Sequence, residues 1–312
     1  MPHRLTAVTD QDRARWSPSP PLLLWLLWAS YLPCTAGAAP CADYAIGRYT
    51  SIPWGFSTNS YWVEGPAGVV LVDTQFLPSA AREAVVVAES YTGKQVTAAL
   101  VLHANPDKFN GTAVLAEHGA EVLTSAPVRA LIPGVDALRR KWFEGRYRPD
   151  YPDHLVLPDS FGDTTATRNL AGLEFKLHVL GPAVSKAHVV AELDGHLFVG
   201  DLVANRHHAW LELGQLDPWI EILQRLKALH PRYVHPGRGY EGGPELLDRQ
   251  IDYLRFVKAR VATRHPAGEL DGATQQALIE EIEQQYPGYG NSYFLSLGLP
   301  AVWQALSTAG SQ

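Results

Sequence analysis

The feature that most constrains the fold is a short apolar run at residues 97–102 that stops abruptly at a cluster of polar residues. The run has the length of a buried strand and is too short to indicate a helix by its own pattern. Pro106 and Gly111 then favour a turn, because proline lacks a backbone N–H and glycine tolerates positive φ. Open α/β folds tend to hold their chemistry at the ends of buried strands. A polar loop that caps the next helix would give the same pattern.

Strand-length runs of this kind alternate with helical segments along most of the chain. A hairpin is expected up to residue 72, and a helical segment follows at 79–91. The second half returns to strands, with the last of a group at 196–199 before Gly200 and Asp201. This alternation predicts the α/β class.

Bulk composition bounds the kinds of partner. The chain has 312 residues, of which 46% are hydrophobic and 19% are charged, so it can bury a sizeable core. Its formal net charge is −6, which argues against a nucleic-acid partner or an anionic membrane surface.

The first 39 residues have the order of a secretory signal peptide. The apolar block at 21–32 is too short to span a bilayer as a helix. Small residues follow it at 35–39, and three arginines precede it, at Arg4, Arg13 and Arg15. We therefore expect a periplasmic or secreted protein with no stable membrane span after cleavage. A retained membrane anchor is the alternative.

Five landmarks occur in an order that resembles the metallo-β-lactamase superfamily over roughly residues 45–264. They are VLVDT at 70–74, the polar loop after VLH at 101–103, a GP loop before HVVAEL at 188–193, GDL at 200–202 and PGRG at 236–239. The resemblance implies an αββα sandwich that binds metals at one end, between its two sheets. The expected organisation is a signal peptide at 1–39, a metallo-β-lactamase-like domain at 40–264 and a C-terminal helical extension at 265–312.

The resemblance also implies a set of metal ligands, of which only three of seven remain. The family's H-x-H-x-D-H loop matches here at His103 and Asp107, and its bridging aspartate matches at Asp201. The other four positions, where the family has histidines, hold Asn105, Lys108, Val184 and Arg238.

These replacements place fixed cations beside retained acids. Lys108 and Arg238 stand where neutral imidazoles would be, so two acids and two cations sum to zero without a metal. At about 5 Å, a fixed ammonium repels a divalent ion by several kcal/mol even at an effective dielectric near 20. Zinc also loses the donors it needs. The hypothesis is that Asp107 and Asp201 are neutralised by Lys108 and Arg238.

A rearranged site for one zinc ion at most is the competing expectation. It would use His103, Asp107 and Asp201 with two further histidines, His188 and His235. Ordinary hydrogen-bonded histidines would explain the last two as well. The residues expected to contact substrate are Asn105, His188, His207, His208 and Trp210.

Two kinds of function follow. The first is an exported hydrolase of a small ester, lactone or amide, in which a metal or His103 with Asp107 activates water beside Asp201. Lys108 or Arg238 would then stabilise the oxyanion. The second is a non-catalytic protein whose neutralised cleft binds a small, anionic ligand through unpaired donors. The basic and aromatic segment 139–148 is expected to be a solvated helix or a lid beside the pocket. A third hypothesis for the function is a structural or interaction protein that uses this segment as its contact surface.

Overall fold

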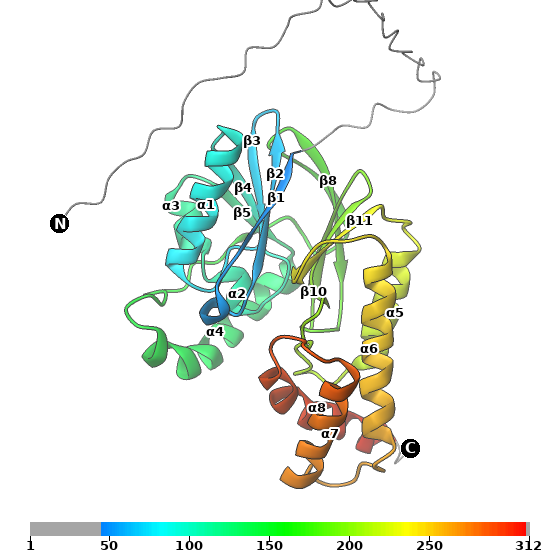
Figure 1. Ribbon diagram of the computed structural model, residues 1–312. Coiled ribbons are helices and arrows are strands. Elements are labelled where there is room, and N and C mark those ends of the chain that lie inside the picture. The colour runs from blue at the N-terminus through cyan, green and yellow to red at the C-terminus, as the bar shows by residue number, and fades with distance from the viewer. Residues whose placement is uncertain (1–44, 310–312) are drawn as a thin grey trace, which may run out of the picture. The chain divides into compact units, whose positions relative to one another are not determined.

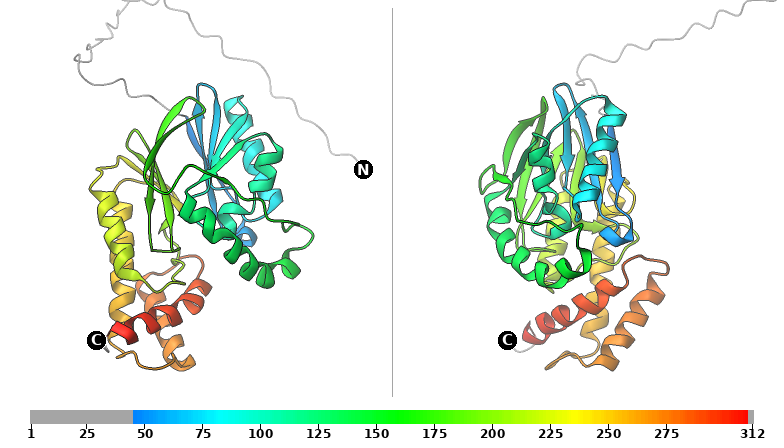
Figure 2. Two further views of the ribbon diagram at one scale, coloured as in Figure 1. Left: turned by 180° about the vertical axis from the view of Figure 1, so that it is seen from behind. Right: turned by 90° about the vertical axis from the view of Figure 1, so that its left-hand side faces the viewer.

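Two β-sheets packed face to face form the centre of the computed structural model, which describes residues 45–309 (Figure 1). Helices α1 (Pro78–Thr92) and α3 (Thr112–Glu117) cover the outer face of the first sheet. Helices α5 (Leu216–Lys227) and α6 (Glu245–Ala262) cover that of the second, as the views in Figure 2 also show. The arrangement is the predicted αββα sandwich of the α/β class.

The first sheet has the strand order β1-β2-β3-β4-β5-β6. Its first three strands pair antiparallel and the others pair parallel. Strands β3 and β4 read as continuous apolar runs, as expected for parallel strands covered on both faces. The strands are β1 (Ile46–Thr50), β2 (Asn59–Gly65), β3 (Gly68–Val72), β4 (Val96–Leu100), β5 (Glu121–Thr124) and β6 (Asp159–Ser160).

The second sheet has the order β11-β10-β9-β8-β7, and only the β10–β11 pair is parallel. Its strands are β7 (Ala166–Leu170), β8 (Leu173–Leu180), β9 (His188–Leu193), β10 (His196–Ala204) and β11 (Tyr233–Arg238). Strand β10 is longer than predicted, because it bends at Gly200 (φ 54°) with a shift of register and then continues. Asp201 therefore lies within a strand.

Three further elements, two short and one long, lie at the lower end of the sandwich in Figure 1. They are η1 (Pro53–Gly55), α2 (Pro106–Phe109) and the long helix α4 (Ala126–Tyr147). The sequence pattern predicted the beginning of α4 and offered a solvated helix or a lid for residues 139–148, of which all but Arg148 lie in this helix. The helix starts at Ser125, whose side chain accepts a hydrogen bond from Val128 N, and it continues through Pro133.

The C-terminal extension packs on the same domain. Helices α7 (Gly272–Gln285) and α8 (Tyr293–Ala309) lie beside α6 and bury apolar side chains against it, including Leu278, Leu295 and Leu299. Within residues 45–309, no helix is both long and apolar enough to cross a membrane. The predicted signal peptide, and with it the expected periplasmic or secreted location, concerns residues that lie outside this described part.

Candidate functional site

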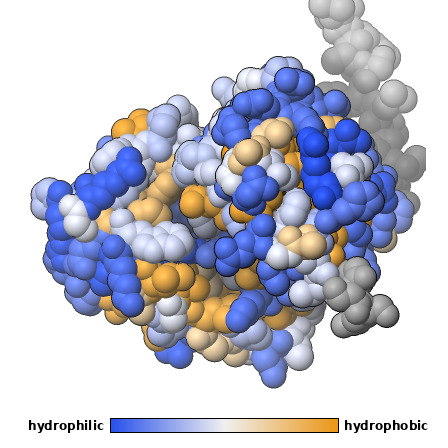
Figure 3. All heavy atoms as spheres, turned by 90° about the horizontal axis from the view of Figure 1, so that it is seen from below, coloured by the Kyte–Doolittle hydropathy of each residue, from blue (hydrophilic) through white to orange (hydrophobic). Residues whose placement is uncertain are grey.

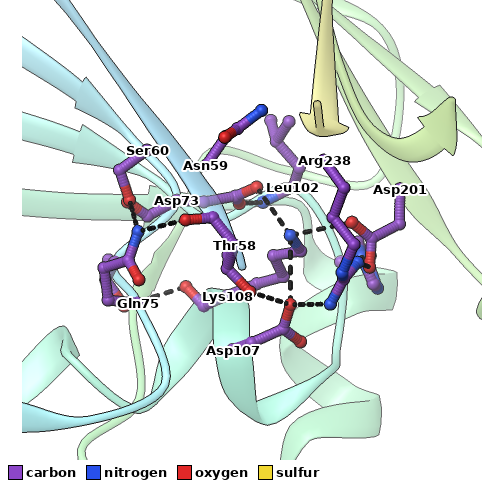
Figure 4. Close-up of polar contacts among 12 residues, drawn as sticks. Thr58, Asn59, Ser60, Asp73, Gln75, Leu102, Asp107, Lys108, Asp201 and Arg238 are labelled. Carbon is purple, nitrogen blue, oxygen red and sulfur yellow. Dashed lines mark hydrogen bonds and ion pairs between the residues drawn. The ribbon is translucent and has the colours of Figure 1, made fainter. Parts of the chain in front are cut away.

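Five charged side chains meet at the lower end of the sandwich, between the two sheets (Figure 4). Asp73 directly follows β3, and Asp107 and Lys108 lie in α2. Asp201 comes from β10 and Arg238 from the end of β11. All five are buried. We call this group the charged cluster.

Lys108 is at the centre of the charged cluster, with none of its surface exposed. Its Nζ lies 2.9 Å from Asp201 Oδ1, 3.2 Å from Asp107 Oδ2 and 3.7 Å from Asp73 Oδ2. These contacts lack hydrogen-bond alignment but are within ion-pair distance, and the attraction between full charges depends mainly on distance. Burial by itself would lower the pKa of Lys108, but the three carboxylates together raise it.

Arg238 uses all three of its guanidinium nitrogens inside the protein. Its Nη1 lies 2.6 Å from Asp201 Oδ2, and its Nη2 donates to Asp107 Oδ2 at 2.8 Å. Its Nε donates to the carbonyl of Phe56 at 3.1 Å. The two carboxylates raise the pKa of Arg238 against the effect of burial. Each guanidinium nitrogen of Arg238 therefore already has a partner inside the protein.

The two retained acids are held as carboxylates by these cations. Burial would raise the pKa of each, but Lys108 and Arg238 lower the pKa of Asp107 and hold that of Asp201 well below its usual range. Thr58 also donates its hydroxyl to Asp107 Oδ2 at 2.9 Å. Each of the two acids therefore contacts both cations.

Asp73 is a third acid in the charged cluster, in addition to Asp107 and Asp201, which the sequence predicted. Its Oδ1 accepts a hydrogen bond from Leu102 N at 2.9 Å, and its Oδ2 faces Lys108. Burial outweighs the attraction of Lys108 and raises the pKa of Asp73 to about 6. Three acids thus face two cations, and the net charge of the five groups lies between −1 and zero, depending on the proton of Asp73.

His103 and His188 lie behind the charged cluster. His103 Nε2 is 3.4 Å from Asp201 Oδ2, so its acidic neighbour is Asp201 and not Asp107. His188 Nε2 accepts a hydrogen bond from Ser185 N at 2.9 Å. Burial lowers the pKa of His188 well below its usual value. Both rings are fully buried, and neither lines the pocket described below.

The other three predicted histidines contact no acid of the charged cluster. His235 stacks on Phe198, with ring centroids 4.4 Å apart. His208 Nδ1 is 3.1 Å from Tyr253 Oη, and His207 Nδ1 is 2.9 Å from the carbonyl of Asn205. None of these three histidines lines the inner pocket described below.

The donors in the charged cluster do not fit a zinc ion. Among residues 45–309, no group of three or more His, Cys, Asp or Glu side chains is arranged to hold a metal. Both oxygens of Asp201 and Oδ2 of Asp107 already contact Lys108 or Arg238. A divalent ion would have to displace an ammonium or a guanidinium from a buried site, which leaves an uncompensated charge.

An inner pocket of about 40 Å³ opens beside the charged cluster, with room for a few water molecules. Asp107, Asp201 and Arg238 line it, as do Asn105 and Trp210, two of the residues expected to contact substrate. Further wall residues that the sequence did not identify are Phe56, Phe76, Arg139, Phe143 and Phe294.

A larger groove of about 580 Å³ adjoins the inner pocket and shares Phe56, Phe143 and Trp210 with it. Figure 3 shows this end of the molecule as a hollow bordered by apolar residues. Helices α4 and α8 and the segment around η1 supply its walls. The sequence held one signal for it, namely the spacing of aromatic and basic residues along α4.

Comparison with known proteins agrees with this architecture. The family model of the metallo-beta-lactamase superfamily matches residues 53–238. A metallo-beta-lactamase from Pontibacter korlensis has a similar structure, with a TM-score of 0.50, 21% identity, and coverage of 68% of this chain and 94% of that one. The metallo-beta-lactamase FIM-1 from Pseudomonas aeruginosa, in its mono-zinc form, gives a TM-score of 0.50 and 19% identity, and covers 68% of this chain and 89% of its own.

At these identities the solved structures support the fold alone, whereas the family model spans more than half of the chain. The match includes the loop with Asp107 and Lys108 and ends at Arg238. On this evidence the chain belongs to the metallo-beta-lactamase superfamily.

Proposed function

We propose that this chain is a metal-independent member of the superfamily that binds a small molecule in its cleft without hydrolysing it. The observation that carries the proposal is the pairing of the charged cluster. Lys108 and Arg238 together contact both carboxylates that the family uses for metal. The charge of a metal ion is therefore supplied by the side chains of the chain itself.

The candidate groups for hydrolysis are poorly placed for it. A general base has to reach the water or substrate from which it takes a proton. His103 is fully buried, faces Asp201 and does not line the inner pocket. The proposed oxyanion donors, Lys108 and Arg238, are already engaged by carboxylates. In the inner pocket, an ester, lactone or amide would thus have His103 out of reach, and both proposed oxyanion donors would already be paired with carboxylates.

Binding, in contrast, has support from the shape and lining of the cleft. Ligand sites in proteins are typically concave, mostly apolar and provided with a few polar groups. The groove beside the charged cluster has that character, with aromatic walls and a polar inner end. The paired charges would make that inner end rigid, because each ion is held by partners from other elements.

The test is a turnover assay on a chromogenic ester, lactone and β-lactam, with and without added zinc. We expect the wild-type chain and Asp201→Asn to hydrolyse all three at the same background rate. Zinc-stimulated turnover by the wild type that Asp201→Asn abolishes would contradict the proposal and restore the metallo-hydrolase interpretation. Metal-independent turnover above background that requires His103 would overturn it as well.

A further inference from the structure

One face of α4 carries alternating basic and aromatic side chains toward the groove. Arg139, Trp142, Phe143, Arg146 and Tyr147 follow the i, i+3, i+4, i+7, i+8 spacing of a single helical face. All except Arg139 line the groove, and Arg139 lines the inner pocket next to it. The face therefore runs from the charged cluster outward to the mouth of the groove.

The rest of the groove wall is also largely aromatic and partly open to solvent. Trp54 comes from η1, and Tyr293 and Leu297 come from α8. These three side chains and Trp142 are each between 44% and 48% exposed. Large half-exposed apolar side chains around one concave surface are typical of a binding site. Their flat rings suit a planar aromatic molecule.

The inner end of the groove does not favour an anion. Arg139 Nη2 is paired with Glu212, whose Oε2 also accepts from Trp210 Nε1 at 2.9 Å. With this pair included, the inner end holds three cations and four acids, or three acids when Asp73 is protonated. An anionic group would gain no net attraction there.

The inner end nevertheless contains a donor that lacks an acceptor. Arg139 Nη1 is buried, and no hydrogen-bond partner for it exists among residues 45–309. Its guanidinium lies over the rings of Trp142 and Trp210, with its carbon 4.4 Å and 5.3 Å from their centroids. An unpaired buried donor costs free energy, which an uncharged oxygen acceptor would recover.

The outer end of the groove, in contrast, carries a cation without a paired carboxylate. The guanidinium carbon of Arg146 lies 4.9 Å from the ring centroid of Trp54 and 5.6 Å from that of Tyr147. In the described part of the chain, no carboxylate lies within ion-pair distance of Arg146, unlike Arg139 and Arg140 on the same helix and Arg148 directly after it. Arg146 is thus an uncompensated cation at the mouth of an aromatic groove.

We propose that the groove binds a planar aromatic acid, with its acidic group at Arg146 and an uncharged hydrogen-bond acceptor directed toward Arg139. The two arginines are seven positions apart in the helix, so their Cα atoms lie about 10 Å apart along its axis. That spacing suits a ligand of about two fused rings. The inference rests on the proposed small-molecule binding in the cleft and adds the chemical class and orientation of the ligand. It also moves the recognition of the anion from Lys108 and Arg238 to Arg146.

Two fluorescent naphthalene probes of similar size test the charge requirement. One is the anionic 8-anilinonaphthalene-1-sulfonate, and the other is the uncharged N-phenyl-1-naphthylamine. We expect Arg146→Gln to weaken binding of the anionic probe about threefold to fivefold, the range of an exposed ion pair. Binding of the uncharged probe should stay the same. Arg146→Lys should retain most of the affinity, which a purely stacking role of the guanidinium would not predict.

Arg255→Gln is the matched control, because Arg255 is an exposed arginine on α6, away from the groove. It changes the net charge equally and should leave both probes unaffected. If Arg146→Gln weakens neither probe, or both to the same extent, the assignment of an acid at Arg146 is wrong.

Phe143→Leu and Phe143→Ala separate this outcome from a failure of the proposed function. Phe143 lies in both the inner pocket and the groove, so removal of its ring should weaken both probes by about tenfold or more. Weakening by Phe143→Ala without any effect of Arg146→Gln would leave binding in the cleft intact and overturn only the ligand class. If neither Phe143 variant affects either probe, the cleft is not the binding site and both proposals are overturned.

Discussion

The ammonium of Lys108 lies 2.9 Å from the carboxylate of Asp201, in a site with no exposed surface on the lysine. The resemblance to the superfamily predicted a metal-bridging acid at Asp201, and this contact puts a fixed cation beside that carboxylate instead. Arg238 Nη1 contacts the other oxygen of the same carboxylate, Asp201 Oδ2, at 2.6 Å.

Removal of the Lys108 charge should destabilise the fold strongly. Lys108→Met leaves Asp73, Asp107 and Asp201 with Arg238 as their only cation, and loss of one partner from a buried ion pair typically costs about 3–5 kcal/mol. Urea denaturation of the two proteins measures this difference in the free energy of unfolding.

The matched control for this variant is Lys258→Met. Lys258 forms a solvent-exposed ion pair with Asp217 at 2.6 Å, and such pairs contribute less than about 1 kcal/mol. If the two methionine variants are equally stable, the Lys108 charge is not required to neutralise the cluster.

Stability should decrease as the pH falls below about 6.5. Burial lowers the pKa of His208 to about 4 and that of His235 to about 3. In the window between these values and about 6.5, the unfolded chain binds protons that the folded chain does not, so acid favours unfolding. His235→Phe should therefore reduce the slope of unfolding free energy against pH by up to about 1.4 kcal/mol per pH unit.

Asp73 acts with the opposite sign in part of that window. Because its folded pKa of about 6 exceeds its usual 3.8, the folded chain binds the extra proton between those values and gains stability as the pH falls. Urea titrations at several pH values separate the contributions. If His235→Phe has the same slope of unfolding free energy against pH as the wild type, the buried ring does not titrate as described.

Gly237 should be required next to Asp201. A Cβ at this position would lie 2.1 Å from Asp201 Oδ1 and 2.7 Å from the backbone of Gly200. Gly237→Ala is therefore expected to cost about 1–3 kcal/mol of unfolding free energy, as for overpacking in a filled core. Gly134→Ala in α4 meets nothing within 4 Å and should stabilise the chain by about 0.5–1 kcal/mol. Thermal denaturation would refute this account if both substitutions had the same sign.

The C-terminal helices should unfold together with the sandwich. Leu299 of α8 is fully buried in the core of the second sheet, so Leu299→Ala should cost about 2–5 kcal/mol. Leu297, two residues earlier, is 48% exposed, and Leu297→Ala should change the free energy of unfolding by no more than about 0.5 kcal/mol. A separate early transition in the denaturation of Leu299→Ala would mean that the extension is an independent unit.

Much of the sandwich could be predicted because buried strands and amphipathic helices leave periodic patterns. The meeting of Asp107, Lys108, Asp201 and Arg238 could not be obtained from periodicity, and it followed only from the family resemblance. Asp73 was visible at the end of a strand, but its contact with Lys108 depends on how two elements pack.

The walls of the cleft were the least predictable part. Helix α4 continues through Pro133, where a proline usually signals a helix boundary, so a solvated helix and a lid beside the pocket both stayed open for the segment with Arg139 and Phe143. Phe294 reaches the inner pocket from the C-terminal extension, and no local pattern places so distant a segment at the site. The position of His207, His208 and His235 near motifs indicated a role at the site, but their rings contact other residues.

The most direct test of the central claim is the zinc content of the chain after purification with zinc chloride and desalting, measured by inductively coupled plasma mass spectrometry. If Lys108 and Arg238 neutralise Asp107 and Asp201, the wild-type chain should retain well below one zinc ion per molecule, and Asp201→Asn should not change that value. One or two zinc ions per chain, lost in Asp201→Asn, would contradict the account.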